Sequence, residues 1–273
     1  RLELTMASLT RLSDDLAFAR SIIDRVDSLT LERFTAGDLA VETKADDTPV
    51  TDADREAERV IRAMLGRSRS RDAVYGEEEG GVTVRAARRW IIDPIDGTKN
   101  YMRGVPVWAT LLALEEEGEI VLGIVSAPSL GRRWWGAKGL GAFTGRSWVG
   151  ARRIRVSEVA DLADASISYS SLSGWAARGQ LRAFMRLTQQ AWRTRAYGDF
   201  WSYMLVAEGA VDVAAEPELQ LYDMAALVPI VEEAGGSFTS LHGEPGPWGG
   251  CALATNGLLH ADVLEVLDSV RDG

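Results

Sequence analysis

Apolar residues near the start of the chain recur with the spacing of one helical face. They are separated by three or four positions: Leu9, Leu12, Leu16, Ala19, Ile23 and Val26. This spacing predicts an amphipathic helix that packs one face against a core, and we assign it a packing role only. A second helix is predicted after Asp54, with apolar positions at Ala57, Ile61, Met64 and Leu65. Residues 44–54 are expected to form an extended or hairpin segment that leads into it.

The middle of the chain changes to a strand pattern. Trp90-Ile91-Ile92 predicts a short buried strand, and further strands are predicted at residues 110–114, 120–125, 133–137 and 139–142. Glu116-Glu117-Gly118 separates two of these strands and is typical of a hairpin turn, so an antiparallel sheet is expected. Trp134 and Trp135 should point to opposite faces of one strand, because side chains alternate along it. One is expected in the core, and the other at a substrate or subunit surface.

From about Ala151 onward strands and helices alternate, which is typical of an α/β layer. Strands are predicted at residues 165–170, 194–197, 211–215 and 251–255, and helices at 177–190, 200–208, 224–233 and 258–270. Glu216 is expected in a loop after the third of these strands. We therefore expect one catalytic unit with an α+β half, residues 6–150, and an α/β half, residues 151–273. Residues 1–5 are expected to be an N-terminal extension outside the fold.

Composition narrows the class of protein. The formal charge of −10 repels phosphate backbones, so we expect no nucleic-acid partner, and an anionic substrate would need bound cations to approach. No apolar run is long enough to span a bilayer, and no signal-peptide pattern is present. The single cysteine, Cys251, excludes an internal disulfide and fits a reducing, cytoplasmic location. Two histidines are too few for a zinc cluster. The basic residues 85–89 are expected on the surface.

The candidate chemistry centres on the segment that follows the predicted strand 90–92. Pro94 disfavours helix for Asp93, so this carboxylate is expected at the end of the strand. A turn at Asp96-Gly97-Thr98 can aim both carboxylates and the Ile95 carbonyl at one point. Such an oxygen-rich, anionic point suits Mg²⁺. The alternative is an ordinary turn without metal, since Asp-Pro and Asp-Gly steps are common turn formers.

Three further motifs accompany this segment. Gly76-Glu77-Glu78-Glu79 precedes it, and Tyr222-Asp223-Met224-Ala225-Ala226 and Glu233-Ala234-Gly235-Gly236 follow it. Residues 44–54, Lys-Ala-Asp-Asp-Thr-Pro-Val-Thr-Asp-Ala-Asp, fit the same series. In this order the motifs resemble the inositol monophosphatase family of Mg²⁺-dependent, lithium-sensitive phosphatases, over nearly the whole chain. The resemblance implies a layered αβαβα sandwich of the α+β class.

The resemblance also implies a set of metal ligands and catalytic groups. Glu77, Asp93 and the Ile95 carbonyl would hold one Mg²⁺, and Asp93, Asp96 and Asp223 a second. A third, weaker ion would lie near Glu77 and Asp54, which makes two to three ions in all. Glu77 would orient the attacking water with help from Thr98, and the amides of Gly97 and Thr98 would receive phosphate oxygens. The residues themselves leave alternatives open, because Thr51 and Asp54 have capping-box spacing and Asp223 is a favoured helix N-cap.

Residues 105–108, 197–201 and 216–218 are similar to the histidinol-phosphate phosphatases of this family. Histidinol phosphate carries an ammonium and an imidazole, which carboxylates at Asp199 and Glu216 would attract. We therefore expect hydrolysis of this small phosphorylated substrate, with Asp199, Glu216, Asp223, Gly97 and Thr98 in contact with it. The alternatives are an inositol monophosphatase of broad specificity and a non-catalytic regulatory protein that retains the fold. The resemblance further implies a homodimer.

Overall fold

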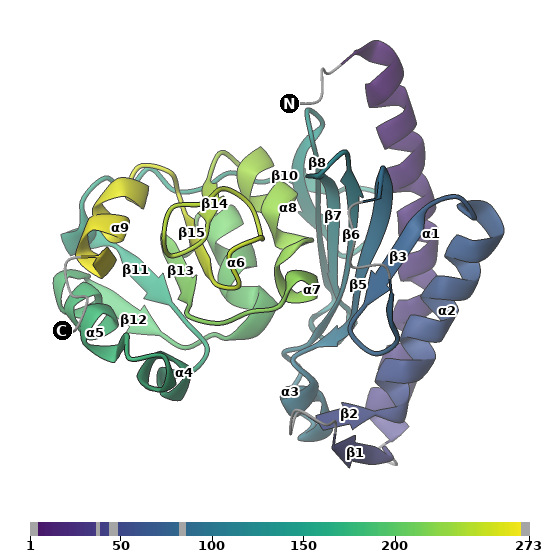
Figure 1. Ribbon diagram of the computed structural model, residues 1–273, viewed down its shortest axis with the longest axis horizontal. Coiled ribbons are helices and arrows are strands. Elements are labelled where there is room, and N and C mark those ends of the chain that lie inside the picture. The colour runs from purple at the N-terminus through teal and green to yellow at the C-terminus, as the bar shows by residue number, and fades with distance from the viewer. Residues whose placement is uncertain (1–4, 37–38, 44–48, 82–85, 269–273) are drawn as a thin grey trace.

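The computed structural model describes residues 5–36, 39–43, 49–81 and 86–268 and arranges them in layers (Figure 1). Helices α1 (Met6–Ala36) and α2 (Asp52–Ser68) cover one face of an eight-stranded sheet. Helices α6 (Asp199–Ala207) and α8 (Leu227–Glu233) fill the space between this sheet and a five-stranded sheet. Helices α4 (Leu172–Ala177), α5 (Leu181–Gln190) and α9 (His260–Asp268) cover the outer face of the second sheet. This αβαβα sandwich confirms the predicted fold class.

The N-terminal helix has the apolar face that the spacing predicts. Leu12, Leu16, Ala19, Ile23 and Val26 are buried against Trp90, Ile92, Leu112 and Leu114 of the first sheet. Before α2, strands β1 (Val41–Thr43) and β2 (Pro49–Thr51) pair antiparallel, as expected of a hairpin. Residues 44–48 of the predicted segment lie outside the described residues.

The first sheet has the strand order β10-β9-β8-β7-β6-β5-β3-β4. Its strands are β3 (Ala73–Gly76), β4 (Gly80–Gly81), β5 (Arg88–Asp96), β6 (Ala109–Glu116), β7 (Glu119–Ala127), β8 (Arg132–Ala137), β9 (Gly141–Gly145) and β10 (Arg152–Arg153). All neighbours are antiparallel except β3 and β5. The predicted β6–β7 hairpin is confirmed, and its turn residues Glu117 and Gly118 both have left-handed backbones, with φ of 50° and 83°.

The prediction that the central strand ends at Asp93 is wrong. Strand β5 continues through Pro94 to Asp96, and its register against β6 shifts between Asp93, which pairs with Leu111, and Asp96, which pairs with Ala109. The extra residue on β5 is a β-bulge, the kind of position at which a strand tolerates proline. The Pro94 carbonyl accepts a hydrogen bond of 2.8 Å from the Thr110 hydroxyl, which holds the bulge.

The two adjacent tryptophans of β8 point to opposite faces, as predicted. Trp134 packs with the helices between the sheets, and Trp135 packs with the α1 side. The expectation that one of them lines a surface is wrong, because their exposed fractions are 0% and 2%. Both faces of this sheet carry helices, so neither position has access to solvent.

The second sheet has the order β12-β11-β13-β15-β14 and is mixed. Its strands are β11 (Ser166–Ser168), β12 (Arg193–Arg195), β13 (Val213–Glu216), β14 (Ser237–Thr239) and β15 (Ala252–Thr255). Strands β12, β11 and β13 run parallel to one another. Strand β15 is antiparallel to both of its neighbours, β13 and β14. The helix predicted at residues 177–190 is present as α5 but begins only at Leu181, because α4 ends at Ala177 and Gly179, with φ of 67°, interrupts the helical backbone. Glu216 ends β13 and is not in a loop.

Helix α8 lies very close to the first sheet. A Cβ atom at Gly123 would lie 2.0 Å from the Ala226 carbonyl oxygen, and one at Gly136 would lie 2.6 Å from the Pro229 carbonyl oxygen. Glycine at both strand positions is therefore required for this approach. The short helix α7 (Leu221–Met224) directly precedes α8, so the same packing also sets the position of Asp223.

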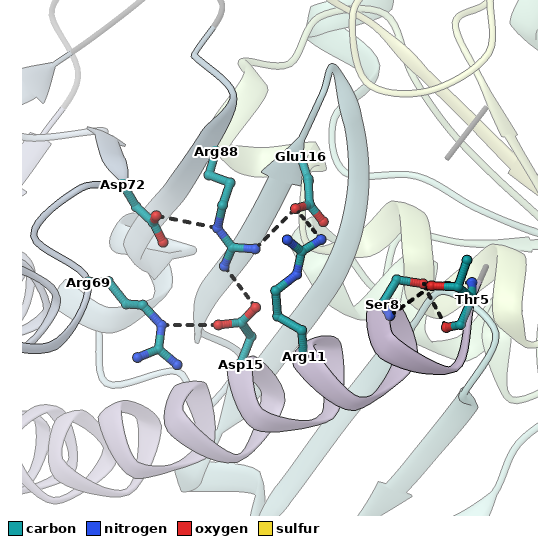
Figure 2. A network of polar contacts seen from close by, with 8 residues as sticks. All are labelled: Thr5, Ser8, Arg11, Asp15, Arg69, Asp72, Arg88 and Glu116. Atoms are coloured by element: carbon teal, nitrogen blue, oxygen red, sulfur yellow. Dashed lines mark hydrogen bonds and ion pairs between the residues drawn. The ribbon is translucent and has the colours of Figure 1, made fainter. Parts of the chain in front are cut away.

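The two basic residues that begin β5 are ion-paired within the fold, so their expected surface role is wrong where the structure describes them. The Arg88 guanidinium donates to Asp15 at 2.7 Å, to Asp72 at 3.3 Å and to Glu116 at 3.3 Å (Figure 2). Arg89 is buried and pairs with Glu115. Residue 85 lies outside the described residues. The network joins α1, the end of α2 and two strands.

Within the described ranges, none of the helices is sufficiently long and apolar to cross a bilayer.

Candidate active site

Three carboxylates from distant parts of the chain converge at one end of β5. Asp93, Asp96 and Asp223 each offer an oxygen atom, and these atoms lie within 4.8 Å of one another. In a regular strand two residues three positions apart would point to opposite faces. The bulge between Asp93 and Asp96 removes this conflict, and α7 brings Asp223 to the same point.

Glu77 extends the acidic cluster from the neighbouring strand. It follows β3, and its amide donates to the Ile92 carbonyl at 3.1 Å, so it continues the parallel pairing with β5. Its charge raises the pKa of Asp93 and of Asp223. The structure therefore brings together the four acids that the sequence analysis selected: Glu77, Asp93, Asp96 and Asp223.

Burial and mutual repulsion make this cluster unfavourable as four free anions. Burial, followed by the charges of Glu77, Asp96 and Asp223, raises the pKa of Asp93 well above its usual range. Burial, followed by Asp199 and Asp223, does the same for Asp96. Burial is also the main reason that the pKa of Asp223 rises to about 7. A bound cation is the simplest way to stabilise such a group of carboxylates.

One carboxylate oxygen in the cluster is suited to a cation. Among the described residues, Asp93 Oδ1 is buried and has no hydrogen-bond partner. An unpartnered buried carboxylate oxygen costs free energy unless a cation or a donor reaches it. The donors gathered here are oxygens only, which is the set that hard divalent cations prefer. The residues thus fit a Mg²⁺-type metal site.

The cap predicted at the start of α2 is present. The Asp54 side chain accepts from the Thr51 amide at 2.7 Å, and the Asp54 amide donates to the Thr51 hydroxyl at 3.3 Å. Asp54 also faces the site, because the Thr98 hydroxyl lies 3.4 Å from Asp54 Oδ1 and donates to the Ile95 carbonyl at 3.0 Å. Capping and a role near the site are therefore compatible for this fully buried residue.

The turn after β5 has the predicted form. Gly97, with φ of 85°, is the N-cap of the short helix α3 (Thr98–Met102). A Cβ atom at Gly97 would lie 2.9 Å from the Val107 carbonyl oxygen, so both the backbone angle and the available space require glycine. The turn places Gly97 and Thr98 on the wall of the same cleft as the acids.

The acids line a cleft of about 540 Å³ between the two halves of the chain. Most of the predicted site residues are in its lining: Glu77, Asp93, Ile95, Asp96, Gly97, Thr98, Asp199 and Asp223. Residues that the sequence analysis did not assign to the site also line it, among them Lys99, Asn100 and Ser170. Lys99 and Asn100 directly follow the predicted turn, and this position in the sequence could have identified them as site residues. Ser170 follows a strand whose sequence gives no sign of a site.

Asp199 begins α6 in a left-handed backbone conformation, with φ of 49°. Its Oδ2 accepts from the Asn100 amide at 3.0 Å, and its own amide donates to the Ser170 hydroxyl at 2.8 Å. The next amide, of Phe200, donates to Asp96 Oδ2 at 2.7 Å. Burial raises the pKa of Asp199, and the Lys99 charge opposes that shift. The start of α6 is therefore bonded to the acidic cluster.

Glu216 ends β13 and is not in the lining of the cleft, but it is hydrogen-bonded to Ser170, which is. Its side chain is buried, and within the described part of the chain its Oε1 has no hydrogen-bond partner. Burial raises the pKa of Glu216 to about 7, against hydrogen bonds with Ser170 that lower it. The charges of Asp199 and Asp223 raise the pKa further, so all three carboxylates share one electrostatic environment.

Comparisons with known proteins point to one family. A model of the inositol monophosphatase family matches residues 12–271. A histidinol-phosphatase of Streptomyces coelicolor is 59% identical, over 93% of this chain and 97% of its own. A histidinol-phosphatase of Mycobacterium tuberculosis is 57% identical, over 94% of this chain and 98% of its own. The solved structure of a Thermotoga maritima IMPase superposes with a TM-score of 0.82 at 33% identity, over 94% of this chain and 97% of that one.

Proposed function

The chain belongs to the inositol monophosphatase family, and we propose that it is a histidinol-phosphatase that converts L-histidinol phosphate and water to L-histidinol and phosphate. The observation that carries this proposal is the identity of 57–59% to two histidinol-phosphatases over almost their full lengths. The chain is accordingly a phosphoric monoester hydrolase that acts on a small phosphorylated substrate, within histidine biosynthesis.

The proposed cofactor is Mg²⁺, with two to three ions in each active site. Glu77, Asp93 and the Ile95 carbonyl would hold one ion, and Asp93, Asp96 and Asp223 the second. Asp54 would lie near a third. The support is the convergence of oxygen donors, the raised pKa values of the acids and the unpartnered Asp93 Oδ1. When bound, such ions supply Lewis-acid stabilisation of phosphate charge and lower the pKa of a coordinated water.

The chain's own groups would orient the reactants. Glu77 is proposed to hold the attacking water as the acceptor of its proton, and the Thr98 hydroxyl to share in that hydrogen bonding. The Thr98 hydroxyl is held in place by the Ile95 carbonyl at 3.0 Å. The backbone amides of Gly97 and Thr98, at the start of α3, are proposed to donate to phosphate oxygens. Together these groups would align the water, the phosphorus atom and the leaving oxygen.

Substrate choice is proposed to depend on Asp199 and Glu216. Histidinol phosphate presents an ammonium group and an imidazole, both of which favour a carboxylate partner. Glu216 offers an oxygen without another partner among the described residues, and only one oxygen of Asp199 is bonded to Asn100. An inositol ester offers hydroxyls and no cation, so it would benefit less from these carboxylates.

A panel of phosphate esters tests the proposal. Phosphate release should be fastest from L-histidinol phosphate, should require Mg²⁺ and should stop in excess chelator. Faster release from myo-inositol 1-phosphate would favour an inositol monophosphatase of broad specificity. Absence of release from every ester, in protein that binds Mg²⁺, would favour a regulatory protein that retains the fold.

We further propose a homodimer and a cytoplasmic location. A cytoplasmic location suits the buried free thiol of Cys251.

A further inference from the structure

A buried carboxylate outside the acidic cluster has no role in the reaction described so far. Glu58 lies on α2, one helical turn after Asp54, and none of its surface is exposed. Burial of a carboxylate is costly unless it is hydrogen-bonded or paired. Glu58 has such partners, because its Oε1 accepts from Arg62 Nε at 2.8 Å. Its remaining partners belong to the segment that carries Glu77.

The two residues after Glu77 donate their backbone amides to Glu58. The Glu78 amide donates to Glu58 Oε2 at 2.8 Å, and the Glu79 amide donates to Oε1 at 3.1 Å. One carboxylate therefore accepts hydrogen bonds from two consecutive backbone amides. Hydrogen bonds to a charged acceptor are roughly twice as strong as those between neutral groups, so this contact fixes the turn firmly.

The residue before Glu77 is adapted to the same contact. A Cβ atom at Gly76 would lie 2.2 Å from Glu58 Oε1, and therefore only glycine leaves room for the carboxylate. Arg62, the ion-pair partner of Glu58, also bonds the Gly80 carbonyl and lies 3.4 Å from a Glu79 carboxylate oxygen. The turn is thus held by α2 from Gly76 to Gly80.

The geometry points to Glu58 as a positioning residue that holds Glu77 in the orientation needed for a metal ligand. On one side the Glu77 amide bonds Ile92 of β5, and on the other side Glu58 bonds the next two amides. These bonds restrain the backbone of Glu77, and its side chain is hydrogen-bonded to Asp93. The inference rests on the proposed metal role of Glu77.

A carboxylate is needed at position 58 because both of its partners in the turn are donors. In Glu58→Gln, one amide N–H group of the side chain would face a backbone N–H, and that contact becomes repulsive. The shape of the side chain is retained, so the change removes the acceptor and the charge with little loss of packing. Mutation of a residue that orients a metal ligand without touching the metal typically changes metal affinity by about 10–100-fold.

The first measurement uses metal-free protein. In Glu58→Gln the amides of Glu78 and Glu79 should exchange with solvent deuterium faster than in the wild type, whereas amides of β5 should not change. Glu56→Gln is the matched control, because Glu56 is exposed on the same helix. Unchanged exchange at residues 78 and 79 would overturn the proposed clamp, independently of any activity.

The second measurement is Mg²⁺ binding by calorimetry. The Kd of Glu58→Gln should rise by about tenfold or more, and the Mg²⁺ concentration for half-maximal activity should rise in parallel, while kcat returns toward the wild-type value at saturating Mg²⁺. In a Glu77→Gln background the same change should have little further effect on the Kd. Faster exchange with an unchanged Kd would overturn the positioning role.

A second variant covers the case in which Glu58→Gln does not fold. Gly76→Ala displaces the Glu58 carboxylate from the strand side and should produce the same two changes. Wild-type protein that binds Mg²⁺ but hydrolyses no ester would contradict the proposed function and leave the inference supported by the Kd. Gly76→Ala protein with wild-type exchange and wild-type Mg²⁺ affinity would contradict the inference alone.

Discussion

Asp199 and Asn100 are joined by a hydrogen bond of 3.0 Å, from the Asn100 side-chain amide to Asp199 Oδ2, across the cleft between the two halves of the chain. Asn100 also donates to the Val107 carbonyl at 2.9 Å, so its orientation is fixed. One oxygen of Asp199 is therefore held toward the first half. The next amide, of Phe200, donates to Asp96, so the start of α6 is bonded both to the first half and to the acidic cluster.

Replacement of either central acid should abolish activity without loss of the fold. In Asp93→Asn or Asp96→Asn an amide keeps the size of the side chain but cannot neutralise a cation, so turnover should fall by orders of magnitude. Burial and repulsion raise the pKa of both acids, so the neutral amide should leave the melting temperature in chelator unchanged or higher. Phosphate release and thermal melts measure the two effects. Asp14→Asn, at an exposed position on α1, is the control. Full activity of Asp93→Asn or Asp96→Asn would rule out the metal mechanism.

Asp199→Ala should lower the activity toward a substrate that carries a positive charge and not toward one without it. Loss of one charge-assisted contact costs roughly 1.5–3 kcal/mol, so kcat/KM for L-histidinol phosphate should fall more than tenfold. A minimal phosphate ester without an amine should be hydrolysed at nearly the wild-type rate. Steady-state kinetics with both substrates provides the test. An equal fall for both would mean that Asp199 acts through Asp96, to which the start of α6 is hydrogen-bonded.

Lithium should inhibit the enzyme at concentrations on the order of millimolar, because a small cation can compete for a weak oxygen site open to solvent. Sodium at equal ionic strength is the control. An enzyme indifferent to lithium far above this range would contradict the proposed weak, solvent-open cation site.

Stability should decrease on acidification through His260. Its ring lies between the hydroxyls of Thr239 at 2.9 Å and Thr255 at 3.0 Å. Burial lowers the pKa of His260 below its usual 6.5, so the stabilisation is present above pH 6.5 and is lost as pH falls through the lower, folded-state pKa. Urea unfolding from pH 8 to pH 5 should show a shallower decrease for His260→Gln than for wild type. The exposed His242→Gln is the control, and parallel curves for wild type and His260→Gln would refute the assignment.

The protein should be a dimer in solution. Of its nine tryptophans, Trp192 and Trp248 have the exposed side chains, 66% and 47%, and aromatic residues are enriched at interfaces. Light scattering over a broad concentration range should give twice the chain mass. Trp192→Glu or Trp248→Glu should shift the mass toward the monomer, and a wild-type monomer at all concentrations would contradict the prediction.

Elements that depend on neighbours along the chain could be predicted from the sequence. The spacing of apolar residues determines the α1 face, and Glu117-Gly118 suits the left-handed turn between β6 and β7. The motif around Asp93 and Asp96 predicted a turn with oxygen ligands suited to a metal, because residue type and turn chemistry are local properties. The order of the motifs was sufficient to indicate the family and hence the layered fold.

Tertiary structure alone decided the features that depend on contacts between distant segments. The bulge in β5 follows from pairing with β6, and the burial of Trp135 follows from α1 on the outer face. The bond between Asn100 and Asp199 and the clamp of Glu58 on the turn after Glu77 each join separate parts of the chain. Spacing along a sequence reports which residues share a face of one element. It does not report which faces meet, because that depends on the packing of the whole core.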